Sequence, residues 1–192
     1  QGYSSAASDV YKRQMGRSIN TEFAKVKRLV SVSPQETAVA PNLTVRENLE
    51  FIAGIYGMDR KHAKEKTDEL VREFSMGEVE KSKAKTLSGG WQRRLSIAMA
   101  LITEPKILFL DEPTLGLDVI ARRELWQIIN SVKKNVTIVL TTHYMEEAEK
   151  LSDKVAVMVK GEIKAVGTVS ELLQRTGKQN LEETFVSIVG VE

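Results

Sequence analysis

The sequence predicts an α/β fold, in which a parallel β-sheet carries helices on both faces. Two continuous apolar runs, residues 106–111 and 136–142, have the length and composition of strands that are buried on both sides. A helical pattern over residues 118–132 separates them, which is the order expected of parallel strands joined by a crossover helix. The 192 residues are enough for one domain with a hydrophobic core.

Another strand and two helices are predicted upstream of this unit. Residues 26–33 are short, β-branched and bounded by Pro34, which indicates a strand. Thr44 and Glu47 have the spacing of a helix capping box. The first helix then has an apolar face made of Val45, Leu49, Ile52, Ala53 and Tyr56. The second has a charged outer face, which we expect to be solvated, and an inner face made of Ala63, Thr67, Leu70, Val71 and Phe74.

The C-terminal part of the chain predicts a hairpin and two short helices. Residues 153–166 contain two strand-like runs on either side of Lys160 and Gly161, which are expected to form the turn. Short helices are expected near Ser170 and near Leu181. The sequence contains no internal repeat and no low-complexity tract.

Composition excludes several kinds of function. The chain has no cysteine, which rules out disulfides, thiol catalysis and zinc–thiolate sites. Its net charge of +2 gives no reason to expect nucleic acid or an anionic membrane as a partner. The longest apolar runs, such as residues 97–102, are far too short to span a bilayer. We therefore expect a globular domain without a transmembrane helix of its own.

The first 14 residues differ in character from the rest. They have no helical or strand periodicity, and residues 9–14 (DVYKRQ) resemble the translation of an adaptor used to prepare DNA sequencing libraries. We therefore interpret residues 1–14 as a non-native segment and expect native sequence from about Met15. The alternative is a disordered natural terminus. In either case few contacts with the sheet are expected.

Two carboxylates, Asp111 and Glu112, stand at the carboxyl end of an apolar strand. In open α/β sheets this end of the strands is where ligands bind. Buried charge there needs a partner, and Mg²⁺ bound to phosphates is the natural one. Asp111 would hold the metal directly or through water, and Glu112 would deprotonate an attacking water as general base. The alternative, from these residues alone, is an acidic turn after a core strand.

The segment Leu87-Ser-Gly-Gly90 comes directly before an amphipathic helix and predicts an anion-binding site. Gly89 and Gly90 let a ligand approach the backbone closely, and the first N–H groups of a helix are free to bind it. Ser88 adds a hydroxyl, and the helix dipole favours negative charge. The same three residues also suit an ordinary helix start, which is the alternative.

Two further side chains follow predicted strands. Gln35 comes after a strand and Pro34, where its amide would reach a metal or a water. His143 follows the strand TIVLTTH, where its imidazole would donate a hydrogen bond to a γ-phosphate. Each would be an ordinary polar residue if it stood alone. Together with Asp111 and Glu112 they all follow strands at what would be one edge of one sheet.

Residues 15–192 resemble the ATP-binding subunit of an ABC transporter, nearest to the subunits of ABC-2-type exporters. Five segments in the family's order carry this resemblance: SPQ ending at Gln35 (Q-loop), LSGGWQRR from Leu87 and including Gln92 (signature), ILFLDEPT with Glu112 (Walker B), LGLD ending at Asp118 (D-loop) and TTH ending at His143 (switch histidine).

The resemblance implies a P-loop NTPase-type parallel sheet with a helical signature subdomain at about residues 42–90 and C-terminal helices at about residues 170–192. It implies ATP and Mg²⁺ as cofactors, Asp111 and Gln35 as metal ligands, and catalytic roles for Glu112 and His143. Nucleotide contacts are implied for Gln35, Leu87, Ser88, Gly89, Gly90, Gln92 and Asp118.

The resemblance also implies two partners. One is a second ATP-binding domain packed head to tail, and the other is a separate transmembrane permease; no nucleic acid is expected. Such a subunit would lie in the cytoplasm, peripheral on the inner face of the cell membrane.

One expected part is missing. The sequence has no Gly-x-x-x-x-Gly-Lys-Ser/Thr, the Walker A phosphate loop that precedes the Q-loop in this family. We therefore expect a domain incomplete at its N-terminus, and a fragment that is inactive alone although its parent protein is an ATPase.

The main alternative is an ABC ATPase that acts in translation or DNA repair rather than in transport. Chromosome-type members insert a long coiled coil between Q-loop and signature, whereas the interval here is about 50 residues without sustained heptads. Translation-type members carry two cassettes, which this sequence leaves open. A non-catalytic interaction module is a third possibility, and the pair of Asp111 and Glu112 argues against it.

Overall fold

The computed structural model describes residues 13–190 of the chain. The chain forms two compact units, of which the first runs to Thr141 and the second begins at Thr142. Within the described range, no helix combines the length and the apolar character that a membrane crossing requires.

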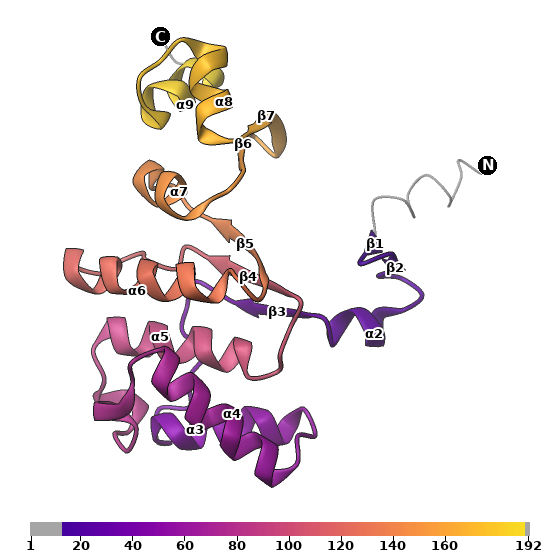
Figure 1. Ribbon diagram of the computed structural model, residues 1–192, viewed down its shortest axis with the longest axis vertical. Helices are drawn as coiled ribbons and strands as arrows, with labels where there is room; N and C mark the ends of the chain where they lie inside the picture. The colour runs from indigo at the N-terminus through magenta and orange to yellow at the C-terminus, as the bar shows by residue number, and fades with distance from the viewer. Residues whose placement is uncertain (1–12, 191–192) are drawn as a thin grey trace. The chain divides into compact units, whose positions relative to one another are not determined.

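The centre of the first unit is a three-stranded parallel sheet with the strand order β3, β4, β5 (Figure 1). The strands span Val30–Ser33, Ile107–Asp111 and Thr137–Thr141. Ser33 lies opposite Leu110, which in turn lies opposite Leu140. The carboxyl ends of the three strands therefore meet at one edge of the sheet, as the sequence predicts.

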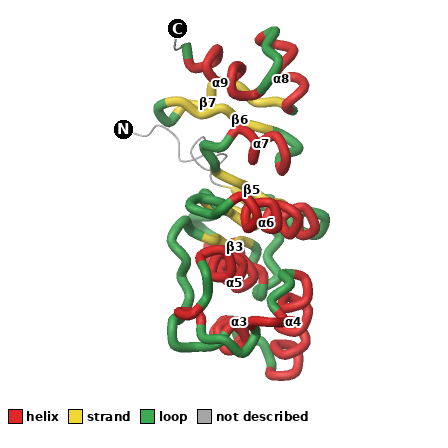
Figure 2. The backbone as a smooth tube through the Cα atoms, turned by 90° about the vertical axis from the view of Figure 1, so that its left-hand side faces the viewer, coloured by secondary structure: helices red, strands yellow, loops and turns green. Residues whose placement is uncertain are grey.

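Helix α5 (Gly89–Leu101) packs against β3 and β4 on one face of this sheet (Figure 2). Two polar pairs fix its position along β3. The hydroxyls of Ser96 and Ser33 lie 3.1 Å apart, and those of Thr103 and Ser31 lie 2.9 Å apart. Because alternate residues of a strand point to opposite faces, Ser31 and Ser33 mark the face that α5 covers.

The opposite face of the sheet keeps apolar side chains accessible. Val32 and Val139, which share this face, are 58% and 41% exposed. Helix α6 (Val119–Val132) packs along α5, and its buried side chains are Leu125, Trp126, Ile128, Ile129 and Val132. The α/β fold with a parallel sheet is present as expected. In the first unit, however, the face opposite α5 keeps an exposed apolar surface, whereas strands buried on both sides were expected.

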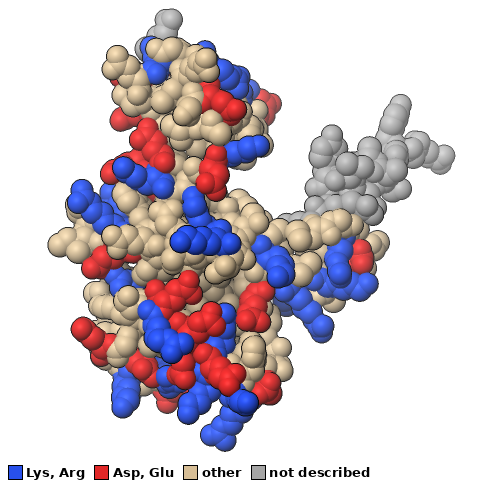
Figure 3. All heavy atoms as spheres, viewed as in Figure 1, with Lys and Arg blue, Asp and Glu red and all other residues tan. Residues whose placement is uncertain are grey.

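Helices α3 (Val45–Ile55) and α4 (Arg60–Glu73) pack against each other, and two short 3-10 helices, Gly77–Val79 and Ala84–Thr86, lead from them to α5. Their predicted inner faces are confirmed for Val45, Leu49, Ala53, Ala63, Thr67, Leu70, Val71 and Phe74, which are all buried. Acidic and basic side chains are intermixed over the outer surface of this region, as predicted (Figure 3).

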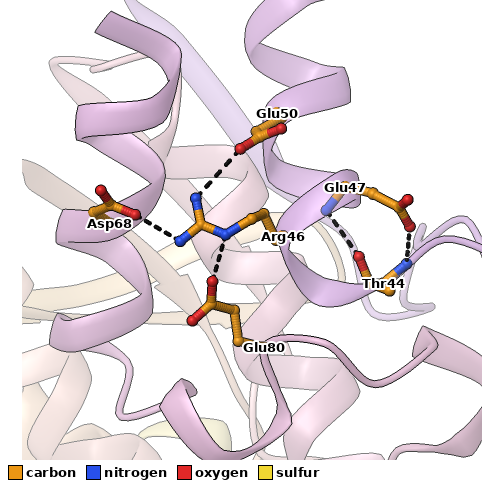
Figure 4. Close-up of polar contacts among 6 residues, drawn as sticks. All are labelled: Thr44, Arg46, Glu47, Glu50, Asp68 and Glu80. Carbon is orange, nitrogen blue, oxygen red and sulfur yellow. Dashed lines mark hydrogen bonds and ion pairs between the residues drawn. The ribbon is translucent and has the colours of Figure 1, made fainter. Parts of the chain in front are cut away.

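Arg46 of α3 holds this helical region together (Figure 4). Its guanidinium contacts Asp68 of α4 at 2.5 Å and Glu50 of its own helix at 3.3 Å, and it also contacts Glu80 beyond α4. Burial lowers the pKa of Arg46, but the hydrogen bonds to the three carboxylates outweigh burial and raise it above its ordinary value. The hydrogen bond from Arg46 likewise lowers the pKa of Asp68.

Two predictions about individual elements of this unit are also wrong. The strand expected at residues 26–33 begins only at Val30, because Phe23–Lys27 forms helix α2 and the ladder with β4 starts where Val30 meets Ile107. Tyr56, expected on the inner face of α3, is 51% exposed, because it caps the helix where the chain turns at Gly57.

The segment before α2 contains a small antiparallel pair, β1 (Arg13–Gln14) with β2 (Arg17–Ser18). The prediction made for residues 1–14 falls on residues outside the described range, except for these last two, whose strand pairs with β2.

The second unit contains the predicted hairpin and C-terminal helices. It comprises α7 (Met145–Leu151), β6 (Val155–Val159), β7 (Glu162–Gly167), α8 (Val169–Thr176) and α9 (Leu181–Val189). The hairpin turns at Lys160 and Gly161, which both have positive φ (51° and 81°), as the turn prediction requires. Its core consists of Ala148, Val157, Ala165, Leu172 and Leu181.

Candidate functional site

The carboxyl ends of β3 and β4 bring three of the predicted site residues to one edge of the sheet. Gln35 lies two residues beyond β3, Asp111 is the last residue of β4, and Glu112 follows it. The side chains of Gln35 and Asp111 are exposed and that of Glu112 is half-buried. The hydroxyl of Thr141, at the end of β5, donates a hydrogen bond to the Asp111 carboxylate.

Glu112 has an unusual backbone. Its φ of 45° lies in the left-handed region, which residues with a side chain adopt at a cost of about 1–2 kcal/mol. Its N–H donates to the carbonyl of Thr141 at 3.1 Å, so the turn is fixed against the neighbouring strand. The carboxylate therefore leaves β4 in a direction that a regular strand would not give it.

The predicted anion-binding site lies at the start of α5. Ser88 is the N-cap residue, and Gly89 and Gly90 are the first two residues of the helix itself rather than residues that precede it. Within the described residues the Ser88 hydroxyl accepts no capping hydrogen bond from this helix, so it is available to a ligand together with the first N–H groups.

A pocket of about 330 Å³ opens beside this helix start. Asp118 lines it, and its carboxylate accepts the N–H groups of Ile120 and Ala121 at 2.9 Å each and so caps α6. Trp91 and Arg94 also line the pocket, and the guanidinium of Arg94 lies 4.4 Å from the centre of the Trp91 ring. Arg94 also forms an ion pair with Glu124 of α6.

Two more predicted residues have local structural roles in the same segment. The Gln92 amide donates to the carbonyls of Ala84 and Leu87 at 3.2 Å each, which ties the loop before α5 to its first turn. Leu87 is half-buried at the end of that loop. The hydrogen bonds of Gln92 thereby hold the chain next to Ser88 in place.

His143 belongs to the second unit, two residues beyond β5. It is exposed, and its ring lies 4.2 Å from that of Tyr144, centre to centre, at a tilt of 38°. The expectation that His143 lies beside Asp111 and Glu112 therefore remains a prediction.

Arg93 is the residue that the sequence analysis missed. Its side chain is only 4% exposed, and its guanidinium donates to four main-chain carbonyls at the ends of β3 and β4. The sequence contains a signal for this burial, because Arg93 precedes Ser96 by three residues and Thr103 by ten, spacings that place residues on one face of a helix. It therefore lies on the face of α5 that packs against β3.

The fold is that of an α/β domain with a parallel sheet, and family membership identifies it as an ATP-binding domain of an ABC transporter. The chain belongs to the ABC transporter family, whose family model matches residues 5–115. That match begins within the segment that the sequence analysis set aside.

Characterised relatives agree with this membership. The chain is 36% identical over 173 residues to the linearmycin resistance ATP-binding protein LnrL of Bacillus subtilis (strain 168), a match that covers 90% of this chain and 56% of LnrL. It is 38% identical over 162 residues to the human phospholipid-transporting ATPase ABCA3, covering 84% of this chain and 10% of ABCA3. The chain thus spans about half of LnrL and a tenth of ABCA3.

A solved structure supports the same fold. The structure of an ATP-binding subunit of an ABC transporter superposes with a TM-score of 0.76 at 28% sequence identity, covering 90% of this chain and 73% of that one. The predicted α/β ABC ATPase fold with a parallel sheet is thereby confirmed.

Proposed function

We propose that this chain is part of an ATPase that drives transport, of the ABC-2 exporter type, and that Glu112 is its general base. The observation that carries the proposal is the placement of Glu112, beside Asp111 at the end of β4 with its backbone in the left-handed region. Such strain persists only where the surrounding structure enforces it, and it clusters at active sites.

The donor set fits Mg²⁺ with a nucleoside triphosphate. Among residues 13–190 no three acidic or histidine side chains form a metal site of their own. Mg²⁺ in nucleotide sites takes only one or two protein ligands, since phosphate oxygens and waters supply the rest. Asp111 and Gln35 supply that number at adjacent strand ends. When bound, Mg²⁺ offsets negative charge on the phosphates.

The chain's own residues then have distinct tasks. The Glu112 carboxylate accepts a proton from the attacking water, and the His143 imidazole donates to the terminal phosphate. Ser88, Gly89 and Gly90 offer a hydroxyl and backbone N–H groups to an anion. We assign Leu87, Gln92 and Asp118 to the same nucleotide site, which is supported by their place around the start of α5.

Two partners belong to this proposal. A second ATP-binding domain packs head to tail, so that the Ser88 segment of one domain meets the nucleotide of the other. A transmembrane permease contacts the helical region, for which the exposed apolar side chains of Phe51, Ile55 and Tyr56 on and beside α3 are suited. This arrangement places the domain in the cytoplasm, on the inner face of the membrane.

We further propose that the 192-residue chain does not hydrolyse ATP alone. Its sequence contains no phosphate loop with the lysine and backbone cradle that hold the phosphates. Activity is therefore to be measured on the full-length product of the gene that encodes this chain.

The test is Glu112→Gln, which keeps the size and hydrogen-bonding reach of the side chain and removes its basicity. Hydrolysis should fall by roughly 10²–10⁴-fold, the usual contribution of a positioned base. Nucleotide affinity, measured with a fluorescent ATP analogue, should change little. Glu78→Gln, an exposed glutamate of the 3-10 helix Gly77–Val79, is the matched control. Normal hydrolysis by Glu112→Gln would disprove the role of Glu112.

A further inference from the structure

We infer that Arg93 is a positioning residue, which sets the distance between the Q-loop and the catalytic glutamate and ties both to the signature helix. The inference rests on the roles proposed above for Gln35 and Glu112. It concerns an interaction that runs through main-chain carbonyls rather than through the side chains of the site.

The contacts of Arg93 bridge the ends of two strands. Its Nη1 donates to the carbonyl of Pro34 and, at 3.2 Å, to that of Gln35, both beyond β3. Its Nη2 donates to the carbonyl of Asp111 at 2.5 Å, and its Nε to that of Pro113 at 2.9 Å, both at the end of β4. One planar group therefore fixes two strand ends in relation to each other.

Glu112 lies between the two β4 carbonyls that Arg93 binds. With Asp111 held on one side and Pro113 on the other, the left-handed turn at Glu112 cannot relax without breaking a hydrogen bond to a buried guanidinium. Loss of a hydrogen bond to a charged, buried group is costly. Arg93 thus supplies the local constraint that a strained Glu112 requires.

Arg93 also lies one helical turn after Gly89. A ligand that moves the first turn of α5 therefore moves the group that fixes Gln35 and Glu112. In a head-to-tail dimer the Ser88 segment serves one nucleotide and Glu112 serves the other. Arg93 accordingly links occupancy of one site to the catalytic geometry of its neighbour.

The chemistry requires arginine at this position. A guanidinium has five N–H donors in a rigid plane, whereas lysine has one nitrogen and cannot bond both strand ends at once. Arg93→Lys keeps the charge and removes the bridge. Ser96→Ala, which removes the neighbouring hydrogen bond between α5 and Ser33, is the control for general loosening of this helix.

The first experiment measures steady-state hydrolysis by the full-length gene product. Arg93→Lys should lower kcat by about 10²-fold, as expected for misplacement of catalytic groups by about an ångström, while KM for ATP stays within twofold. Ser96→Ala should leave kcat unchanged. If Glu112→Gln is inactive and Arg93→Lys hydrolyses normally, only the inference fails; if Glu112→Gln is active, the proposed function fails first.

The second experiment needs no activity. In amide hydrogen exchange on the same protein, Arg93→Lys should speed exchange in residues 34–37 and 111–115 but not in α4 or the β6–β7 hairpin. Uniformly faster exchange would mean that Arg93 only stabilises the fold and would overturn the inference. Arg93→Gln, which keeps a planar donor, should show a smaller change at the same segments. Failure of both variants to fold would likewise assign Arg93 to folding rather than positioning.

Discussion

At the residue scale, the two glycines of the signature segment have different reasons to be glycine. A side chain at Gly89 would meet no atom within 4 Å, so the fold itself leaves space there. A Cβ at Gly90 would lie 3.1 Å from the Cβ of Ala121, at the start of α6. The close approach of α5 and α6 therefore favours glycine at position 90, whereas packing places no such demand on Gly89.

This difference predicts a contrast in stability. Gly90→Ala should unfold at a lower temperature than Gly89→Ala, by the equivalent of about 1–3 kcal/mol, because extra volume at a tight contact forces a shift. Thermal unfolding followed by circular dichroism measures it. Adding Ala121→Gly to Gly90→Ala should recover much of the loss, so that the two changes are not additive. Equal stability of the two single variants would contradict the packing role of Gly90.

Individual site residues can be proposed from the sequence only where their chemistry is visible in the chain. Asp111 and Glu112 are candidates because carboxylates at the end of an apolar strand require a partner. Arg93 was missed because it follows Gln92 and precedes Arg94 in a polar run, and its burial becomes visible only when β3 and β4 are placed next to α5. Charge and helical spacing together would have indicated it.

At the scale of elements, two capping boxes fix the starts of α3 and α8. Thr44 with Glu47 and Thr168 with Glu171 exchange side-chain and backbone hydrogen bonds in the same way. The hydrogen bonds from the threonine N–H and hydroxyl lower the pKa of both glutamates below their ordinary value of 4.5. Lys83 also lowers the pKa of Glu47.

The lowered pKa of Glu47 makes the stability of α3 depend on pH. A carboxyl with a lower pKa in the folded chain adds stability above its unfolded value, and this is lost as pH falls through the folded value. Glu47→Gln keeps the hydrogen-bonding shape of the box and removes the charge. The unfolding temperature of the wild type should therefore exceed that of Glu47→Gln near pH 7, and the difference should vanish between about pH 5 and 3. A difference that is constant over this range would contradict the argument.

Elements were predictable where local pattern and tertiary packing agree. The β6–β7 hairpin, the capped α3 and the crossover helix α6 have strong local signals that packing reinforces. The strand expected at residues 26–33 failed because β-branched residues are a weak signal until a partner strand is placed, and pairing with β4 begins at Val30.

At the scale of the whole molecule, the catalytic machinery that we propose depends on parts that one chain does not bring together. The phosphate loop has no counterpart in these 192 residues, and the Ser88 segment is proposed to act on a nucleotide held by another domain. Periodicity within the chain indicates neither where a phosphate loop lies nor which domain the Ser88 segment contacts. This is why the sequence yields candidate segments for the site but does not indicate how they assemble.

The assembly predicts a dimer that ATP holds together. If the Ser88 segment of one subunit binds the nucleotide of the other, slow hydrolysis should trap the closed pair. Size-exclusion chromatography of the full-length gene product with ATP and Mg²⁺ should then show a stable dimer for Glu112→Gln and mostly monomer for the wild type. Adding Ser88→Arg places a long side chain where the free hydroxyl and the first N–H groups of α5 would receive an anion. The trapped dimer should therefore dissociate in the double variant, whereas adding Glu78→Gln instead should leave it intact. A dimer that persists with Ser88→Arg would show that the subunits meet through another surface. A contact at the start of α5 could not hold the arginine side chain and still bind the phosphate of the nucleotide.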